Sequence, residues 1–458
     1  MKKLTLIHTM IFLHLVWASA LLAEVSPSSP FADHMVLQRD MAIPVWGTAT
    51  PGEKVTVTLG NDQQSATTTD QGRWQVKLAK HAAGGPYTMT LEGQDRLTLS
   101  DVYVGEVWLC SGQSNMDMTV AEEDRYWCGV INEANEVAAA DHPLIRMFDA
   151  DFTPRTQVQT TVKGKWEVCS PETVGHFSAA AYFFGRELQQ KYNVPIGLVV
   201  TAYGASTAEA WTSQPALEAV PQLKYLLDNY AKKRTDYKTA LQALAPEDAR
   251  ARRRLRNPDT DQHSPYVLYN GMVAPLAPYA IRGAIWYQGE SNGPSAKDYA
   301  LIMETMIEDW RQAWGQGDFP FLYVQLANHQ ALVTDPIKDD PMVLVREGQL
   351  KNLSIPNTAM VVAIDNADDD PGNIHPKDKQ TIGHRLALAA RATVYGEDIP
   401  YSGPIYQGMT VEGKTIRLSF THTHGGLKAQ GEGLKGFAIA GADKAKAMLR
   451  ARNLMRVM

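Results

Sequence analysis

The feature that most constrains the fold is a series of short, solidly apolar runs separated by helix-length segments. The runs contain few polar residues at any position, so both faces of each strand must be buried. The segment SAAAYFFGRELQQKYN (178–193) is typical of what lies between them. This alternation predicts an α/β domain with a parallel sheet covered by helices on both faces. The runs are VWLC (107–110), IGLVVTA (196–202), AIRGAIWY (280–287), FPFLYVQLA (319–327) and TAMVVAID (358–365).

The residues before and after this region follow other patterns. Between about residues 36 and 99, apolar positions alternate with polar ones, and turn-rich pieces such as PGE and DQG separate the runs. Period-two segments with such turns predict a small antiparallel β-sandwich. After about residue 401, TIRLSF and GLKGFAIA predict strands again, and the final AKAMLRARNLMRVM predicts a basic amphipathic helix. We therefore expect an N-terminal β domain (24–101), an α/β domain (102–400) and a partial β segment with a basic tail (401–458).

The first residues have the order of a secretory signal. Lys2 and Lys3 precede an apolar run over residues 4–17, and the small residues ASA (18–20) follow. We expect residues 1–23 to be a signal peptide and the protein to be secreted or periplasmic. No later run approaches the roughly 20 apolar residues that span a bilayer, so no membrane span is predicted. A net charge of −6 offers no broad basic surface, which argues against nucleic acid as a partner.

The chain has three cysteines, so at least one is unpaired in an oxidising compartment. Cys110 lies in the apolar run VWLC, where a thiol packs as a small hydrophobic group. Cys128 with Cys169 is then the one disulfide to consider. No CxxC or HExxH spacing occurs, so no metal site is predicted, and no cofactor is implied.

A charged stretch over residues 221–257 interrupts the α/β pattern. Its pattern predicts a helix, with little apolar stripe toward the end, where the sequence is RARRRLR. Charge runs of this kind are usually solvated, so we expect an excursion packed on the surface. Attraction of acidic glycans is the alternative.

Polar groups follow four of the predicted strands. In doubly wound sheets, ligands bind at the carboxyl edge of the strands, so these groups are expected to meet on one rim although they are far apart in sequence. The groups are Ser114 in SGQSN, Gly204 in GAS, Gln288 in QGESN, and His375 after an acidic loop.

The chemistry of these groups suggests a role for each. Ser114 lies on a tight turn that can expose its hydroxyl and present its own N–H to an oxyanion. A serine needs a base to take its proton, and His375 is the best candidate because an imidazole titrates near working pH. Gly204 can bring a backbone N–H to the same oxyanion, and an amide such as Gln288 or Asn292 can supply another donor. Each signal is common by itself, so the hypothesis depends on their combination.

With these residues in hand, the chain resembles the sialate O-acetylesterase family of the SGNH hydrolases. The resemblance runs from about residue 30 to 436 and implies a flavodoxin-like parallel sheet, Ser114 as nucleophile and His375 as base. It places Gly204 and Gln288 at positions that match the oxyanion blocks. The segments that carry it are HMVLQRDMAIPVWGTATPGEKVTV, VGEVWLCSGQSNMDM, IGLVVTAYGASTAEAW, LYNGMVAPLAPYAIRGAIWYQGESN and NIHPKDKQTIGHRLALAAR.

Three departures from the family pattern matter. SGNH enzymes usually carry an Asp three residues before the His, but Gly372 occupies that position here. The orienting acid is then Glu290, Asp370 or no side-chain acid, with Glu290 ahead of the Ser-His dyad and Asp370 third. The second block has Gly204-Ala205 where two glycines are common, so only Gly204 is carried over. Similar proteins usually continue through more β-rich sequence after GLKGFAIAG, so we expect a shortened last domain or a lost reading frame.

The resemblance implies a serine esterase that removes O-acetyl groups from carbohydrates, with 9-O-acetyl sialic acid as the leading substrate. The first alternative is the same chemistry on another glycan such as acetylated xylan, since a fold fixes the reaction type better than the substrate. A noncatalytic glycan-binding protein is the alternative from another class. Substrate-pocket candidates are Asn115, Asn292 and Glu209, and the expected partner is an acetylated sugar.

Overall fold

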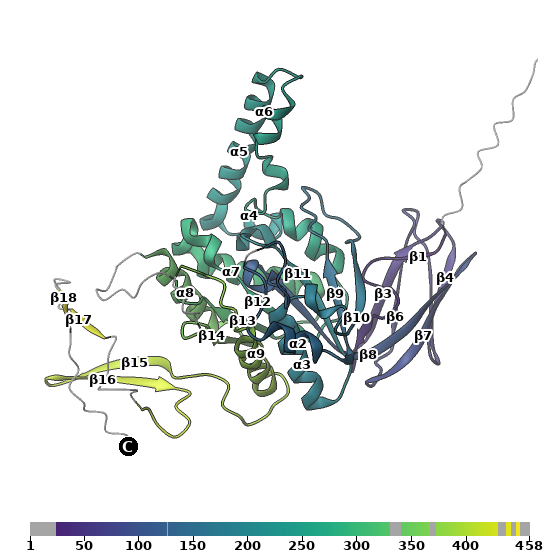
Figure 1. The fold of residues 1–458 in the computed structure, drawn as a ribbon. Coiled ribbons are helices and arrows are strands. Elements are labelled where there is room, and N and C mark those ends of the chain that lie inside the picture. The colour runs from purple at the N-terminus through teal and green to yellow at the C-terminus, as the bar shows by residue number, and fades with distance from the viewer. Residues whose placement is uncertain are drawn as a thin grey trace, which may run out of the picture.

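The computed structural model describes residues 24–125, 127–329, 340–366, 372–428, 437–440 and 446–448. The expected signal peptide, residues 1–23, lies outside the described residues. The N-terminal strands form two groups, to one side of the central sheet (Figure 1). The first group is β1 (Ser26–Pro27), β3 (Ile43–Thr48) and β6 (Arg73–Leu78); the second is β2 (Val36–Gln38), β4 (Lys54–Leu59), β5 (Asp62–Thr67) and β7 (Gly84–Glu92), which join the first half of β8 (Arg96–Gly112).

The central sheet has the order β10-β9-β11-β8-β12-β13-β14, and all neighbours except the edge pair β10–β9 run parallel. The prediction of a mixed α/β domain with a large parallel sheet is therefore confirmed. Its strands besides β8 are β9 (His142–Ala150), β10 (Gly164–Cys169), β11 (Ile196–Ala202), β12 (Gly283–Tyr287), β13 (Phe321–Gln325) and β14 (Thr358–Val362).

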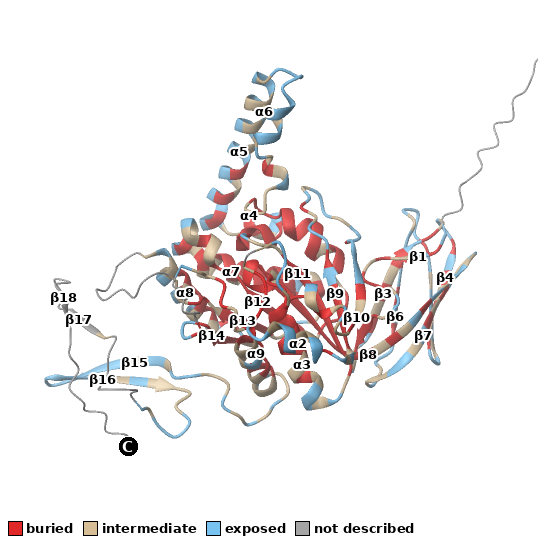
Figure 2. Ribbon diagram, in the orientation of Figure 1, coloured by how far each residue is buried: buried red, intermediate tan, exposed pale blue. Residues whose placement is uncertain are grey.

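The solid apolar runs form strands with a core on each face. In β8, Val107 and Leu109 belong to one buried cluster, whereas Trp108 and Cys110 belong to another on the opposite face. Helices α3 (Ala179–Tyr192) and α9 (Lys379–Thr393) contribute to the second cluster, and α7 (Tyr299–Trp314) contributes to the first. Figure 2 shows the buried residues concentrated along these strands. The remaining helices of the domain's main body are α1 (Ser114–Asp117), α2 (Glu133–Ala138), α4 (Gln214–Glu218) and α8 (Pro341–Lys351).

Strand β8 joins the N-terminal strands to the central sheet without a break. Its first half pairs antiparallel with β7, and its second half pairs parallel with β11 and β12. Asp101 adopts a positive φ of 55° inside the strand, which marks a local distortion between the two halves. The predicted boundary at residues 101 and 102 thus lies within one continuous strand.

The charged stretch forms a helical hairpin that projects from the body of the molecule (Figure 1). It consists of α5 (Lys224–Ala243) and α6 (Ala249–Arg254). Only Leu226 and Tyr230 of α5 are buried, both near its foot, and no residue of α6 is. The predicted helical excursion is confirmed, but it stands away from the surface instead of packing on it.

The C-terminal region forms strand pairs where it is described. β15 (Ile405–Glu412) and β16 (Thr415–Thr421) make an antiparallel hairpin that is largely exposed (Figure 2). β17 (Ala438–Ala440) pairs with β18 (Lys446–Met448). The predicted basic helix at the C-terminus is wrong for residues 446–448, because their backbones pair with another strand. The rest of that segment lies outside the described residues.

The disulfide considered from sequence is also wrong. Cys128 and Cys169 are both free and buried, as is Cys110. The Cys169 thiol donates to the carbonyl of Ala140 at 3.6 Å. Burial raises the pKa of Cys169 to about 12, so this thiol stays protonated at neutral pH.

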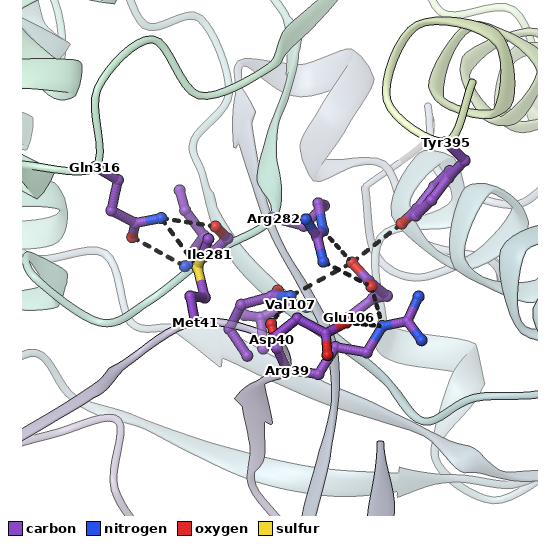
Figure 3. A network of polar contacts seen from close by, with 10 residues as sticks. Arg39, Asp40, Met41, Glu106, Val107, Ile281, Arg282, Gln316 and Tyr395 are labelled. Carbon is purple, nitrogen blue, oxygen red and sulfur yellow. Dashed lines mark hydrogen bonds and ion pairs between the residues drawn. The ribbon is translucent and has the colours of Figure 1, made fainter. Parts of the chain in front are cut away.

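A buried carboxylate ties the N-terminal residues to the α/β domain. Glu106 in β8 is fully buried and accepts from Arg39, which follows β2, and from Arg282, which precedes β12 (Figure 3). The Arg282 Nε–Glu106 Oε2 distance is 2.6 Å, and the hydroxyl of Tyr395 donates to the same oxygen at 3.2 Å. A buried charge needs such partners because it has lost its hydration. Glu106 therefore holds three distant segments together.

We expect Glu106→Gln to lower the free energy of unfolding by about 3 kcal/mol, because it leaves two arginines without their buried counter-charge. Denaturation in urea measures this loss. Glu412→Gln is a matched control, since Glu412 pairs with Arg417 on the exposed hairpin and such pairs contribute little. Equal stability of both variants and the parent would show that the cluster does not hold the segments together.

Candidate active site

The structure brings Ser114 and His375 together. Ser114 opens α1 directly after β8, and His375 lies in the segment between β14 and α9. The Ser114 hydroxyl and His375 Nε2 are 2.7 Å apart, a hydrogen-bond distance. Gly112 makes the turn before Ser114 possible, because its φ is +147° and a Cβ there would lie 2.2 Å from the carbonyl oxygen of Tyr287. A serine hydroxyl and an imidazole, the candidates for nucleophile and base, are thus in contact at the carboxyl edge of the sheet.

The surroundings of His375 keep its imidazole neutral. His375 is 7% exposed, and its ring stacks on Trp127 with centroids 5.0 Å apart. Its backbone N–H donates to the side chain of Asn373 at 2.9 Å, which fixes the loop. Burial, followed by the nearby charge of Lys379, lowers the pKa of His375 to about 4. A neutral ring can accept the Ser114 proton well below neutral pH.

The pH dependence follows from this shift. The base is active when unprotonated, so kcat/KM should hold its value as the pH falls through 6.5 and decline only as the pH approaches about 4. A kcat/KM profile between pH 3.5 and 8, with the melting temperature followed at each point, measures this. An acid limb centred near the ordinary imidazole pKa of about 6.5 would show that the burial and Lys379 do not control the base.

The two predicted oxyanion donors, Gly204 and Gln288, have different surroundings in the structure. Gly204 lies beside the nucleophile, since a Cβ there would be 3.8 Å from Ser114 Cβ, but its N–H donates to the carboxylate of Asp117. Gln288 is fully buried, and its side-chain N–H groups donate to the Ser206 carbonyl at 3.0 Å and to Asn292 Oδ1 at 2.6 Å. The prediction that the Gln288 amide serves the oxyanion is not supported, because both donors are already used. The Ser114 N–H remains as a donor, at the start of a helix where N–H groups have no intrahelical partner.

Asn292 and Glu209 form part of a buried polar cluster beside the site. Asn292 Oδ1 also accepts from the Ala208 N–H at 2.9 Å, and its Nδ2 donates to Glu209 Oε2 at 2.8 Å. Burial raises the pKa of Glu209, and its hydrogen bond to Asn292 opposes the rise. Asn292 is thus a bridge inside the protein, whereas Glu209 also lines a pocket.

The carboxylate of Glu290 contacts Asn115 and not His375. Asn115 is fully buried, and its Nδ2 donates to Glu290 Oε1 at 2.7 Å and to the Ile374 carbonyl at 2.9 Å. No hydrogen bond to His375 Nδ1 is found within the described residues, and Asp370 lies outside them. The predicted bond between Glu290 and the base is therefore absent, because Asn115 occupies the place between the acid and the His375 segment.

Lys379 completes this arrangement, although it was not among the predicted site residues. Its ammonium group is fully buried and donates to Asn115 Oδ1 at 3.0 Å. Burial raises the pKa of Glu290, and the charge of Lys379 opposes that rise. Lys379 lies four residues after His375 in the motif IHPKDKQ, which was the available signal. Trp127 and Arg125, which stack on one another with the guanidinium 4.7 Å from the ring, gave no signal in the sequence.

We expect Glu290→Gln and Asn115→Ala to lower kcat/KM by up to about a hundredfold, because each loosens the segment that holds His375 and small displacements of a catalytic group are costly. Steady-state kinetics with a thermal-melt check of folding measures the loss. The double variant should be little worse than either single variant, since the two residues act through one hydrogen bond. A loss from Glu290→Gln as large as that from His375→Ala would instead make Glu290 a direct partner of the base.

Among the described residues, no cluster of three His, Cys, Asp or Glu side chains could hold a metal ion. In the same residues, no helix combines the length and the apolar character that crossing a bilayer requires.

Comparison with known proteins places the chain in a family. The family model described as "Carbohydrate esterase, sialic acid-specific acetylesterase" matches residues 104–244 and 261–392, leaving out residues 245–260, which include α6. Sialate O-acetylesterase of Mus musculus is 33% identical over 432 residues, which cover 85% of this chain and 77% of that protein. The Homo sapiens protein of the same name is 34% identical, covering 81% and 71%. A crystal structure of a carbohydrate acetylesterase from Xanthomonas citri matches with a TM-score of 0.77 and 34% identity, covering 93% of this chain and 88% of that one. The chain belongs to the carbohydrate esterase family of sialic acid-specific acetylesterases.

Proposed function

We propose that this protein is a serine esterase that hydrolyses O-acetyl esters on carbohydrates, with the 9-O-acetyl groups of sialic acids as its main substrate. The observation that carries the proposal is the 2.7 Å contact between the Ser114 hydroxyl and His375 Nε2, in a chain that belongs to an acetylesterase family. A serine in contact with a neutral imidazole is the minimum that acyl transfer needs.

The geometry supports a two-step reaction. His375 Nε2 accepts the proton of Ser114 as the serine oxygen attacks the acetyl carbonyl carbon, and the Ser114 N–H stabilises the negative oxygen. The C–O bond to the sugar then breaks, and His375 returns the proton to the departing sugar oxygen. An acetyl group remains on Ser114. His375 next takes a proton from water, which attacks the acetyl-serine carbonyl carbon. The bond between that carbon and the Ser114 oxygen breaks, His375 returns the proton to this oxygen, and acetate and free Ser114 are formed.

The substrate is inferred from relatives. The proteins from Mus musculus and Homo sapiens are named sialate O-acetylesterases, and the Xanthomonas citri structure is that of a carbohydrate acetylesterase. Acetylated xylan is the alternative, since the same serine and histidine would act on either ester. A noncatalytic glycan-binding role remains the alternative from another class, and it would leave the contact between Ser114 and His375 without a use.

We also propose that the α/β domain has the SGNH-hydrolase arrangement and that the N-terminal strands form a sandwich-like domain. The strand order β11-β8-β12-β13-β14 supports the first point, because numbered along the chain it is the flavodoxin-like order 2-1-3-4-5, with β9 and β10 added at one edge. Residues 1–23 are proposed as a signal peptide that directs the protein out of the cytoplasm, which the charged, apolar and small-residue order supports.

A substrate panel tests the proposed function. Acetate release is measured with sialic acids acetylated at single positions and with acetylated xylan oligosaccharides, and Ser114→Ala serves as the control for each. We expect turnover to be fastest on the 9-O-acetyl ester. Faster turnover of acetylated xylan would make that glycan the main substrate instead. Binding of glycans without acetate release from any ester would favour the noncatalytic alternative.

A further inference from the structure

A pocket of about 300 Å³ lies at the foot of α5, next to the site described above. One wall comes from α5, where Tyr225, Asn229 and Lys233 recur every four residues and so lie on one face of the helix. The facing wall comes from Glu209, and from Ser291, which follows β12 and Glu290. The volume is at the lower end of the range for small-molecule sites.

The pocket adjoins the nucleophile without including it. The Ser291 N–H donates to Gln113 Oε1 at 3.3 Å, and Gln113 immediately precedes Ser114. Another lining residue, Thr207, follows Gly204 by three positions. A ligand that placed one group at Ser114 could therefore place a neighbouring group in this pocket.

The lining suits a hydroxyl-rich, uncharged ring. Glu209 is 6% exposed and offers a carboxylate as an acceptor, while Asn229, Ser291 and Ser295 offer neutral polar groups. Charges of both signs line the pocket, with Lys233 and His263 as basic residues and Glu209 as the acidic one. His263 lies 2.7 Å from Asp261, and the Tyr225 hydroxyl donates to Asp298 at 2.9 Å. Glu209 disfavours an anionic ligand and Lys233 disfavours a cationic one, while an apolar ligand would leave the polar groups unsatisfied.

We propose that this pocket is a glycan subsite that binds a neutral pyranose unit adjacent to the sugar whose acetyl group Ser114 removes. The inference rests on the proposed esterase function and adds a substrate class to it. The enzyme acts on acetylated sugars within an oligosaccharide in preference to free acetylated monosaccharides. Tyr225 and Asn229 of α5 are then specificity residues, and the base of the α5–α6 hairpin takes part in substrate recognition.

The test compares two substrates in two variants. The substrates are free O-acetylated sialic acid and the same sugar linked to a neutral disaccharide. Asn229→Trp fills the pocket from an exposed helix position, and Lys238→Trp places the same ring at an exposed position of α5 outside the pocket lining. We expect the ratio of kcat/KM for the linked over the free sugar to fall at least about tenfold in Asn229→Trp, which corresponds to the loss of about 1.4 kcal/mol of binding. The ratio should not change in Lys238→Trp.

A binding experiment separates this inference from the proposed function. The deacetylated sialyl trisaccharide is titrated into Ser114→Ala, and into Ser114→Ala carrying Asn229→Trp, with binding followed by ligand-observed NMR. We expect binding to the first protein and its loss in the second. Equal kcat/KM ratios in the two α5 variants, together with equal binding to Ser114→Ala with and without Asn229→Trp, would overturn the subsite and leave the esterase intact. Binding at the pocket without hydrolysis of any acetyl ester would overturn the esterase proposal and the subsite's part in it.

Discussion

Ser114→Ala should lose esterase activity by about a million-fold while the protein remains folded, because the acetyl-serine cannot form without the hydroxyl. The side chain is 6% exposed and its loss removes one oxygen, so Ala is expected to fit the same turn. Acetate release from an acetylated sialic acid, measured with a folding check by circular dichroism, tests this.

Ser291→Ala is the matched control for this change. Ser291 follows another strand on the same edge of the sheet, but its side chain has no part in the proposed acyl transfer. Its variant should keep most of its activity on a small acetyl ester. A folded Ser114→Ala protein with more than a few per cent of the parent rate would remove Ser114 as the nucleophile.

His375→Ala should cost nearly as much, since without the base the Ser114 proton has no acceptor at 2.7 Å. Because the two residues act as a unit, the double variant Ser114→Ala/His375→Ala should be no slower than either single variant. Steady-state rates of all three proteins measure this. Multiplicative losses would show that Ser114 and His375 contribute to separate steps.

Much of the fold could be predicted because burial on two faces leaves a strong pattern in the sequence. Val107 to Cys110 are all apolar since adjacent residues face different cores, and in the run before Gly204 the adjacent Val199 and Val200 likewise belong to different cores. The continuity of β8 could not be predicted, because a strand that changes partners midway shows only a change from alternating to solid apolar character. The C-terminal helix was wrong for residues 446–448 because helical periodicity in a short segment does not exclude strand pairing.

The site was predictable where a side chain follows directly from the end of a strand. Ser114 and His375 met as expected because parallel strands end on one edge of the sheet. The roles expected for Gln288 and Glu290 differ from the structure for another reason. Both residues lie on that edge, but the direction of a side chain depends on its neighbours. The side-chain amide of Gln288 donates to Asn292, and the carboxylate of Glu290 accepts from Asn115.

The missed residues have a similar explanation. A buried lysine such as Lys379 is rare and looks like an exposed helix residue in sequence, because its partners come from other segments. Trp127 lies in a loop whose path no periodicity describes, yet its ring covers the imidazole of His375. These contacts act on the pKa and the orientation of His375. They join segments that are distant in sequence, so no local pattern indicates them.

Labelling with a fluorophosphonate shows whether Ser114 is the nucleophile, because this reagent forms a covalent bond with a serine that a neighbouring base has activated. After partial and complete reaction, peptide mass spectrometry locates the label and acetate release gives the remaining activity. We expect one label, on Ser114, with activity lost in proportion to labelling, and no label in His375→Ala. Full activity after complete labelling of Ser114, or loss of activity with the label on another residue, would contradict the role of Ser114 as nucleophile.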